Sequence, residues 1–348
     1  MKAPDYSTHK KVGPLQALAF RSAARYEPAL EGLTRAFVSR DFIVEREHAG
    51  HGVDELVRAA LKRFDGGTGA KKMWNYTKAH SIEVARFSYV MARESQENGP
   101  AGMSGLDPQL AFSGGLVHDV GKTFIPIAIL VKELGIDFGL FTAFRDAPLT
   151  AAERRIMREE HVAIGTRFVR LFGGGPHIRM MLDMVGLHHV MYNGLDSGVP
   201  SYPSLISGRD LPPHARIIKV ADFLSAVLPR HYRLNGHISS LDHAVAYAIT
   251  AAETELDPVS LRCFITGTYD IGPNRAEAMI SRLKHPDGQH GVSSIGGARE
   301  YAKGVVREDR EFKELIMRRN LEKERRYERE MGEFSRAYSL PPDCLRST

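Results

Sequence analysis

The sequence predicts an all-α protein, and three observations carry this expectation. Apolar residues recur at intervals of three and four, as on the buried face of an amphipathic helix. Alternation of apolar and polar residues, which is typical of a half-buried strand, is scarce. Proline or a capping residue precedes several of the periodic segments, and glycine follows some of them. We therefore expect a helical bundle with a small helical N-terminal region.

A glycine-rich stretch, residues 65–70, is the best candidate for a domain boundary. The chain before it shows helical patterns but no recognisable motif. Towards the C-terminus the sequence becomes highly charged with a thin apolar stripe, which predicts one long helix over about 305–334. We expect three parts: an N-terminal helical region with a regulatory role left open (1–70), a main domain (71–300), and a charged C-terminal helix and tail (301–348).

Start signals define the helices of the main domain. Asp107 is a capping residue ahead of Pro108, and Thr150 forms a capping box with Glu153. The glycine pair at 114–115 lacks side chains, so another helix or a ligand could approach closely there. Together the signals predict helices over residues 74–95, 107–119, 150–173, 178–189, 211–226, 241–253, 258–265 and 274–283.

Seven residues with side chains suited to metal binding fall on these helices or at their ends. Imidazole and carboxylate suit iron, manganese or zinc, and a carboxylate beside a histidine can bridge two ions about 3.5–4 Å apart. The set lacks a neighbouring cysteine, which argues against a structural zinc cage or an iron–sulfur cluster. Such ligands favour a hard oxygen substrate such as a phosphate, so we predict a binuclear hydrolytic site bridged by Asp119. The predicted ligands are His80, His118, Asp119, His161, His188, His189 and Asp222.

Some of these residues are supported by an argument of their own. His80 shares a helical face with apolar residues at spacings of four, three and four, so it faces the core. Asp222 lies among apolar residues, where an unpaired charge would be costly. His188 and His189 are adjacent and cannot face one direction on a regular helix, so the helix must end or distort there. Each residue alone has an ordinary structural explanation; the ordered set favours ligation.

The composition restricts partners and location. The chain has 348 residues and a net charge of +5, but basic and acidic residues are interleaved, so we expect no nucleic-acid polymer as a partner. It contains no apolar run of about 18 residues or more, so we expect no membrane span. Its two cysteines, Cys263 and Cys344, lie far apart, and the first residues lack the apolar core of a signal peptide. A cytoplasmic location is the expectation.

Six short motifs follow one another in the main domain. They are HSIEVA (80–85), LVHDVGK (116–122), EHVAIG (160–165), HH (188–189), ARIIKVAD (215–222) and RHYR (230–233). In this order they resemble the HD-GYP branch of the HD superfamily. The resemblance implies a domain with two divalent ions, iron being favoured and manganese the alternative, that linearises a cyclic dinucleotide, chiefly cyclic di-GMP. His161 and the histidine pair select this branch, because simpler HD hydrolases share only the other four ligands.

The resemblance also implies substrate contacts. Lys122 is similar to the family lysine that contacts the scissile phosphate, and with Asp119 it forms the expected catalytic pair; a surface lysine is the alternative. Arg230 and Arg233 are candidates for the second phosphate or the guanine edge, because arginine offers bidentate geometry. Tyr202 is a further candidate substrate contact.

The loop that gives the family its name is altered in this chain. It corresponds either to GVP at 198–200 or to SYP at 201–203, and the register is open. Val190 and Asn193 stand where the family commonly has carboxylates. Members with a third ion have a glutamate at the position of Tyr76, so we expect two ions here. The changes affect the substrate loop more than the metal ligands.

Three functions therefore follow in order of preference. The first is a binuclear-metal phosphodiesterase, weakly active, that converts a cyclic dinucleotide to a linear one. The second is a degenerate receptor or scaffold that binds the cyclic dinucleotide and signals through the N-terminal region or the C-terminal helix. The third is a general HD nucleotide phosphohydrolase. The charged C-terminal helix is either a dimerisation or partner surface, or a solvated helix packed by one edge against the core, which we prefer.

Overall fold

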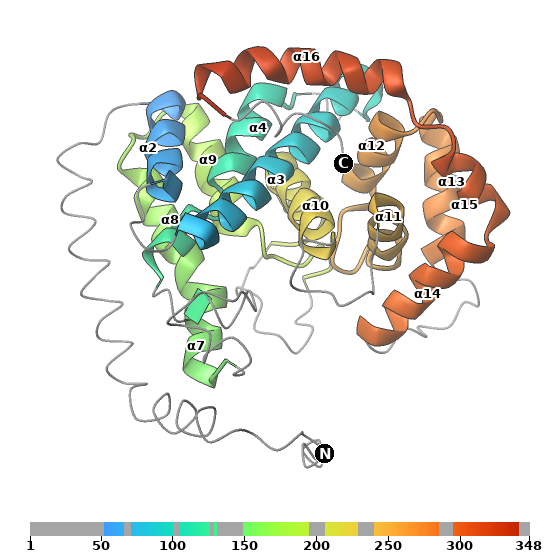
Figure 1. The fold of residues 1–348 in the computed structure, drawn as a ribbon, viewed down its shortest axis with the longest axis horizontal. Helices are drawn as coiled ribbons and strands as arrows, with labels where there is room; N and C mark the ends of the chain where they lie inside the picture. Colours follow the sequence, from blue (N-terminus) through green and yellow to red (C-terminus); the bar gives the residue numbers. More distant parts are fainter. Residues whose placement is uncertain are drawn as a thin grey trace.

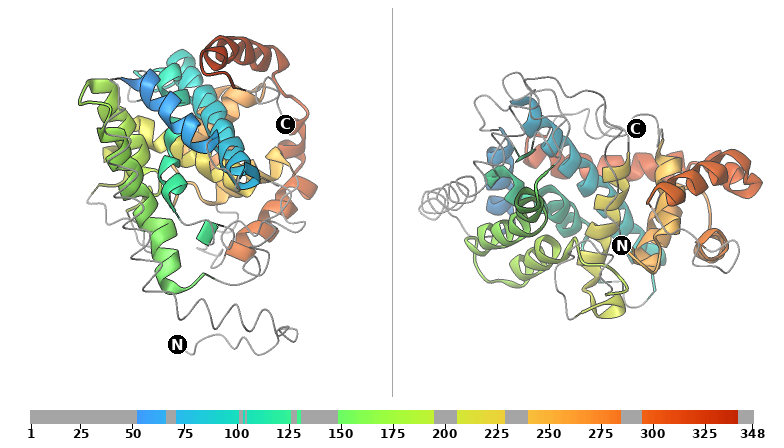
Figure 2. Two further views of the ribbon diagram at one scale, coloured as in Figure 1. Left: turned by 60° about the vertical axis from the view of Figure 1, so that its left-hand side comes forward. Right: turned by 90° about the horizontal axis from the view of Figure 1, so that it is seen from below.

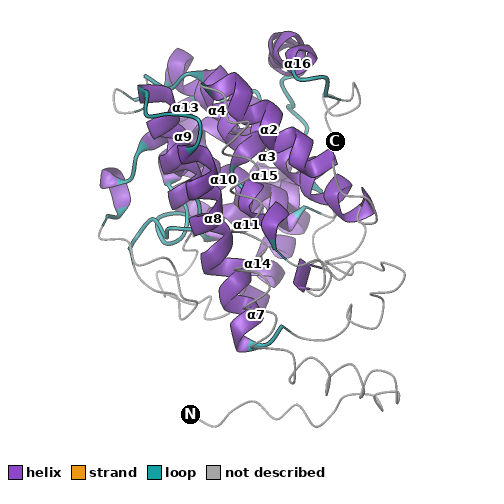
Figure 3. Ribbon diagram, turned by 90° about the vertical axis from the view of Figure 1, so that its left-hand side faces the viewer, coloured by secondary structure: helices purple, strands orange, loops and turns teal. Residues whose placement is uncertain are grey.

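Helices make up the architecture of the protein. The computed structural model describes residues 52–65, 71–100, 103, 105–125, 129–130, 149–194, 206–228, 240–284 and 295–340. Within these residues helices and loops form the bundle and no β-sheet is present (Figures 1 and 3). The expected all-α class is thereby confirmed. The helices are α2 (Val53–Asp65), α3 (Lys71–Asn98), α4 (Pro108–Val117), η1 (Val120–Phe124), α7 (Ala151–Arg155), η3 (Ile156–Glu160), α8 (His161–Arg170), α9 (Pro176–Leu187), η4 (Gly208–Asp210), α10 (Pro213–Val227), α11 (Leu241–Thr250), α12 (Pro258–Thr268), α13 (Pro273–Lys284), α14 (Ile295–Glu308), α15 (Arg310–Ile316) and α16 (Leu321–Ala337).

The long helix α3 lies at the centre of the bundle and packs against α4, α10 and α12 (Figure 1). Its predicted inward face is confirmed, because His80, Val84, Phe87 and Met91 are all buried. Helix α2 contributes buried residues to the same hydrophobic core. Helices α8 and α9 lie on one side of the bundle, and α13 to α15 lie on the other (Figure 2). The expected division into three parts is a prediction that this arrangement does not address.

Two glycines of α4 allow this close arrangement. A Cβ atom on Gly115 would lie 2.4 Å from the Cα atom of Ala85 in α3, and one on Gly114 would lie 2.1 Å from the sulfur of Met184 in α9. Neither site has room for a side chain, so the expected close approach of a neighbouring helix is confirmed. The end of α4, which His118 follows, consequently lies close to α3, which carries His80, and to α9, which His188 and His189 follow.

The capping signals hold, but one predicted helix is interrupted. The Asp107 side chain accepts hydrogen bonds from the backbone N–H groups of Gln109 and Leu110, and Thr150 and Glu153 form the expected capping box. The predicted helix over 150–173 is continuous in path, but residues 156–160 form a π-helical turn between α7 and α8. A π turn shifts the register of the following helix. His161 is the first residue after it.

The prediction of one helix over 305–334 is wrong, because the segment forms α14, α15 and α16. Asp309 and Asn320 cap new helices: their side chains accept hydrogen bonds from the backbone N–H groups of Phe312 and Lys323. These polar residues compete for backbone hydrogen bonds and start a new helix instead of continuing the old one. Leu321, one of the apolar residues of this segment, is 55% exposed.

Helix α16 lies across α3 with one edge buried. The Tyr89 hydroxyl donates to Glu330 at 2.9 Å, and Lys323 pairs with the buried carboxylate of Glu94. Tyr338, just after the helix, donates to Asp54 of α2 at 2.5 Å. These contacts favour the packed alternative for this segment. Dimerisation through it stays a prediction.

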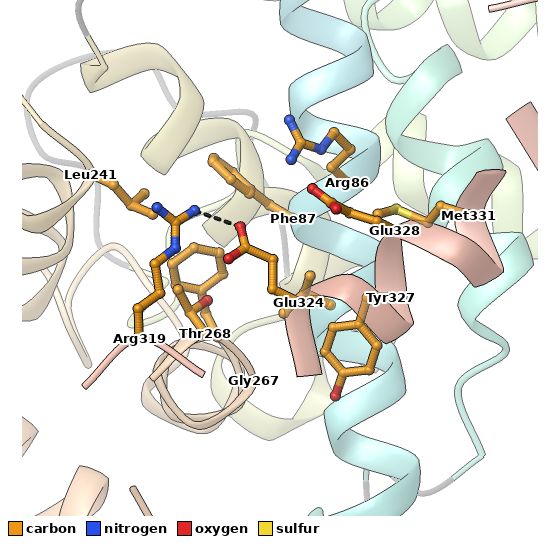
Figure 4. Close-up of a pocket in the computed structure, with 12 residues that line it drawn as sticks. Arg86, Phe87, Leu241, Gly267, Thr268, Arg319, Glu324, Tyr327, Glu328 and Met331 are labelled. Carbon is orange, nitrogen blue, oxygen red and sulfur yellow. Dashed lines mark hydrogen bonds and ion pairs between the residues drawn. The ribbon is translucent and has the colours of Figure 1, made fainter. Parts of the chain in front are cut away.

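A cavity with apolar walls lies between α3, α12 and α16 (Figure 4). Phe87, Phe264 and Met331 line it, and so do Arg319 and Glu324, which form an ion pair 2.6 Å apart. None of the seven predicted ligands is among its lining residues. The cavity is therefore separate from the site described next.

Candidate metal centre

The first group of ligand side chains joins three helices. His80 comes from α3, His118 follows the end of α4, and Asp222 lies in α10. The Asp222 Oδ1 atom is 3.0 Å from His80 Nε2 and 3.7 Å from His118 Nε2. The three residues offer ligand atoms that all lie within 4.8 Å of one another, so this group could hold a metal ion.

The second group consists of histidines alone. His161 begins α8, while His188 and His189 follow the end of α9 at Leu187. The expectation that the helix ends at the histidine pair is confirmed. The Nε2 atoms of His189 and His161 lie 3.2 Å apart, and the three side chains also offer ligand atoms within 4.8 Å of one another.

Asp119 lies between the two groups and turns one oxygen toward each. Its Oδ2 atom is 3.5 Å from the Nε2 atoms of both His80 and His118. Its Oδ1 atom is 3.6 Å from His161 Nε2 and 3.8 Å from His188 Nε2. This is the arrangement in which one carboxylate can bind two ions at once.

Unpaired buried atoms test whether the residues fit metal ions. Among the described residues, His118 Nε2, His188 Nε2 and Asp119 Oδ1 are buried without a hydrogen-bond partner. The other ring nitrogens of the two histidines lie 2.8 Å from backbone carbonyls, those of Gly115 and Val185. Because a carbonyl only accepts, each Nδ1 donates, and each Nε2 is the ring nitrogen left to bind an ion. The residues therefore fit divalent metal ions.

Comparison with known proteins agrees with this geometry. The family model described as "HD domain" matches residues 77–227. Residues 77–227 form an HD domain. The superfamily resemblance is thus confirmed, and the HD domain supports a metal-dependent phosphohydrolase as the class of activity.

Two curated relatives match the chain. One is "Cyclic di-GMP phosphodiesterase" of Vibrio cholerae, 23% identical over 194 residues, which are 55% of this chain and 36% of the relative. The other is "Cyclic di-GMP phosphodiesterase response regulator RpfG" of Xanthomonas campestris, 27% identical over 259 residues, 74% of this chain and 57% of the relative. The chain thus spans between about a third and somewhat over half of the length of these relatives. Among the described helices of this chain, none has both the length and the apolar character to cross a bilayer.

Charge sets the protonation of the first group in the HD domain. Burial would raise the pKa of the Asp119 carboxyl, but Lys122 and His118 hold it well below its usual value. Burial likewise opposes ionisation of Asp222, yet the neighbouring imidazoles of His118 and His80 lower its pKa well below the usual range. Burial lowers the pKa of His118, but the carboxylates of Asp119 and Asp222 outweigh it and raise this pKa to about 10. Without ions, this group therefore holds a proton on His118.

The three histidines of the second group remain neutral. Burial, with the charge of His118 adding to it, lowers the pKa of His188 to about 4. Burial also lowers the pKa values of His161 and His189 well below the ordinary value. Neutral imidazole is the form that binds metal ions. At pH 7 the second group is consequently ready for an ion without losing a proton.

Loading the centre with divalent ions is expected to release protons, because an ion must displace the proton of His118. For each proton displaced, the apparent affinity for the ion should increase about tenfold with every unit by which the pH rises, as long as the pH stays below the pKa of His118. Calorimetric titration with Mn²⁺ at pH 7 and 8, in buffers of different ionisation enthalpy, measures this release. A binding enthalpy and affinity that do not depend on buffer or pH would contradict the prediction.

Lys122 lies beside Asp119, the predicted bridging residue. Its Nζ atom lies 2.5 Å from Asp119 Oδ2, and its side chain is 23% exposed. Gly121, the residue before Lys122, packs tightly against α8. A Cβ atom on Gly121 would lie 1.8 Å from the backbone oxygen of His161. The turn η1 therefore touches the first turn of α8 directly. This contact joins the segment that carries Asp119 and Lys122 to His161 of the second group.

Replacing Gly121 by alanine is expected to destabilise the fold by about 1–3 kcal/mol, the usual cost of overpacking, and to weaken the second group. The added methyl group meets backbone of His161 that no rotamer change can move. Denaturant unfolding and metal titration measure the two effects. Gly105→Ala is the matched control, because a Cβ there meets nothing within 4 Å. Equal unfolding midpoints for the two variants would contradict the prediction.

The structure describes only some of the remaining predicted residues. Arg230, Arg233 and Tyr202 lie outside the described residues, as do both candidate registers of the altered loop. Val190, at a position where the family has a glutamate, is 3% exposed. The N–H group of Asn193 donates to the backbone oxygen of Thr254, so the segment after the histidine pair is attached to the loop between α11 and α12.

Sequence reasoning did not find two polar residues beside His80. Ser225 Oγ lies 2.9 Å from His80 Nδ1 and donates to Glu83 Oε2 at 2.7 Å. A signal was present, since Glu83 follows His80 by three residues and Ser225 follows Asp222 by three, which is one helical turn in each case. Spacing alone does not distinguish such residues from ordinary polar ones.

Proposed function

We propose that this HD domain is a binuclear-metal phosphodiesterase that hydrolyses a cyclic dinucleotide, with cyclic di-GMP as the first candidate, to a linear dinucleotide. The observation that carries the proposal is the position of Asp119, with one carboxylate oxygen facing each ligand group. The second group of three histidines supports a site for two ions. Both relatives are named cyclic di-GMP phosphodiesterases, which supports the substrate class.

The roles of the residues follow from their geometry. His80, His118 and Asp222 would hold one ion, His161, His188 and His189 the other, and Asp119 both. The ions, iron or alternatively manganese, would supply Lewis acidity toward a phosphate ester. Asp119 holds the ammonium of Lys122 at the edge of the centre, where it would stabilise negative charge on the phosphate oxygens. The rings of His118 and His188 are held in position because their Nδ1–H groups donate to the backbone carbonyls of Gly115 and Val185.

A receptor or scaffold for the same ligand is the second candidate. The observation that favours it is the buried apolar side chain of Val190, which removes a negative charge beside the centre. Lost outer-shell partners typically cost about 10- to 100-fold in metal affinity or activity. We therefore expect turnover to be slow if it occurs.

The test combines metal analysis with product analysis. Protein prepared without oxygen should contain two ions per chain, and a timed chromatographic assay with Fe²⁺ or Mn²⁺ should show a linear dinucleotide formed from cyclic di-GMP. The mixed GMP–AMP cyclic dinucleotide tests base selectivity. Binding without cleavage under either metal would favour the receptor, whereas cleavage of mononucleotides that survives His188→Ala would favour a general nucleotide phosphohydrolase.

A further inference from the structure

The orientation of His80 has a different origin from that of the other ligand histidines. His118 and His188 are fixed by backbone carbonyls, which no substitution removes. The Nδ1 atom of His161 has no hydrogen-bond partner within the described part of the chain. His80 Nδ1 instead lies 2.9 Å from the hydroxyl oxygen of Ser225. Its orientation therefore depends on a side chain.

The direction of this hydrogen-bond chain follows from the group at its end. A carboxylate only accepts hydrogen bonds, so the Ser225 hydroxyl donates to Glu83 at 2.7 Å. The hydroxyl oxygen then accepts from His80 Nδ1–H. This leaves His80 Nε2, 3.0 Å from Asp222 Oδ1, as the ring nitrogen that can bind an ion. The chain from Glu83 through Ser225 thus selects the tautomer in which His80 can bind an ion.

The same hydrogen-bond chain connects α3 and α10, two of the three helices that position the first group. Glu83 lies one turn after His80 on α3, and Ser225 lies one turn after Asp222 on α10. Ser225 is 1% exposed, so water does not compete for its hydrogen bonds. A carboxylate behind a ligand histidine also raises the basicity of the ring and its strength as a ligand.

We propose that Ser225 and Glu83 are positioning residues that set the tautomer and basicity of His80, and thereby the affinity of the first group for its ion. The inference rests on the binuclear centre of the proposed function. It predicts that substitutions in this hydrogen-bond chain affect the two ions differently. They should weaken the ion held by His80, His118 and Asp222 and leave the ion held by the three histidines unchanged.

The experiment is a Mn²⁺ titration of metal-free full-length protein, followed by electron paramagnetic resonance. Ser225→Ala removes both hydrogen bonds and should weaken one of two ions about 10- to 100-fold. Glu83→Gln keeps an acceptor for the hydroxyl but removes the charge, so its loss should be smaller. Ser88→Ala is the matched control, because Ser88 is a fully buried serine of α3 whose hydroxyl has no partner among the described residues.

Three results separate this inference from the function it rests on. Two ions bound by wild type, one of them weakened in Ser225→Ala and Glu83→Gln but not in Ser88→Ala, would support it. Two ions bound equally tightly by all four proteins would overturn it and leave the binuclear centre intact. A wild-type protein that binds no divalent ion would overturn both. If Ser225→Ala fails to fold, Glu83→Gln decides, because its partly exposed side chain keeps its shape.

Discussion

Replacing Asp119 by alanine is expected to empty both ion positions and to lower turnover by at least about 10³-fold. The reason is geometric, because this carboxylate, alone among the described residues, has an oxygen near each ligand group, at 3.5 Å on one side and 3.6 Å on the other. Elemental analysis of protein purified without oxygen measures the first effect, and the cyclic di-GMP assay measures the second. Metal binding also adds to the free energy of unfolding, so the melting temperature with added Mn²⁺ should no longer rise above its value in chelator.

His189→Ala is the control for this result. It removes a ligand from the second group only, so it should weaken one ion and leave the other close to its wild-type affinity. Two ions retained by the Asp119 variant would contradict the bridging role. A loss of both ions in the His189 variant would show instead that the two positions fill only together.

Replacing Lys122 by alanine is expected to lower turnover by about 10²- to 10³-fold while both ions stay bound, because the lysine stabilises charge on the phosphate and is not a ligand. In the receptor alternative, the affinity for the cyclic dinucleotide falls instead. The ion-free protein should behave differently. There the ammonium offsets the buried charge of Asp119 at 2.5 Å, so the variant should be less stable than wild type in chelator.

Lys78→Ala is the matched control, because Lys78 pairs with the exposed carboxylate of Asp65 on the surface. Exposed pairs contribute little, so this variant should keep its turnover, metal content and stability. Loss of metal from the Lys122 variant, equal to that of a ligand variant, would show that the lysine holds the centre together and does not act on substrate.

Local signals in the sequence were sufficient for much of the fold. Asp107 and Thr150 cap the helices that they were expected to cap, because a cap depends only on the next three residues. The glycine pair at 114–115 marked the close approach of α3 and α9. The seven predicted ligands, spread over 143 residues from His80 to Asp222, lie together in the structure. An ordered set of rare side chains carries this information even without knowledge of the path between them.

Interactions between distant segments account for what the sequence did not reveal. Glu83 and Ser225 are 142 residues apart and have ordinary polar identities, so only the packing of α3 against α10 brings Ser225 to His80 and Glu83. The π turn before His161 also had no sequence signal that we recognised. The breaks at Asp309 and Asn320 were missed because capping residues are indistinguishable from solvated ones inside a charged segment. There the periodic pattern outweighed the local signal.

The bond between Tyr338 and Asp54 has a consequence for biosynthesis. The two residues are 284 positions apart, and Tyr89 and Glu330 are 241 apart. At about 5–20 residues per second, a ribosome needs roughly 14 to 57 s to travel from Asp54 to Tyr338. During that time the surface of α3 that α16 will cover stays open to water. The bundle is completed only when its final helix has been synthesised, so a nascent chain stalled before residue 320 should bind chaperones that the finished chain does not.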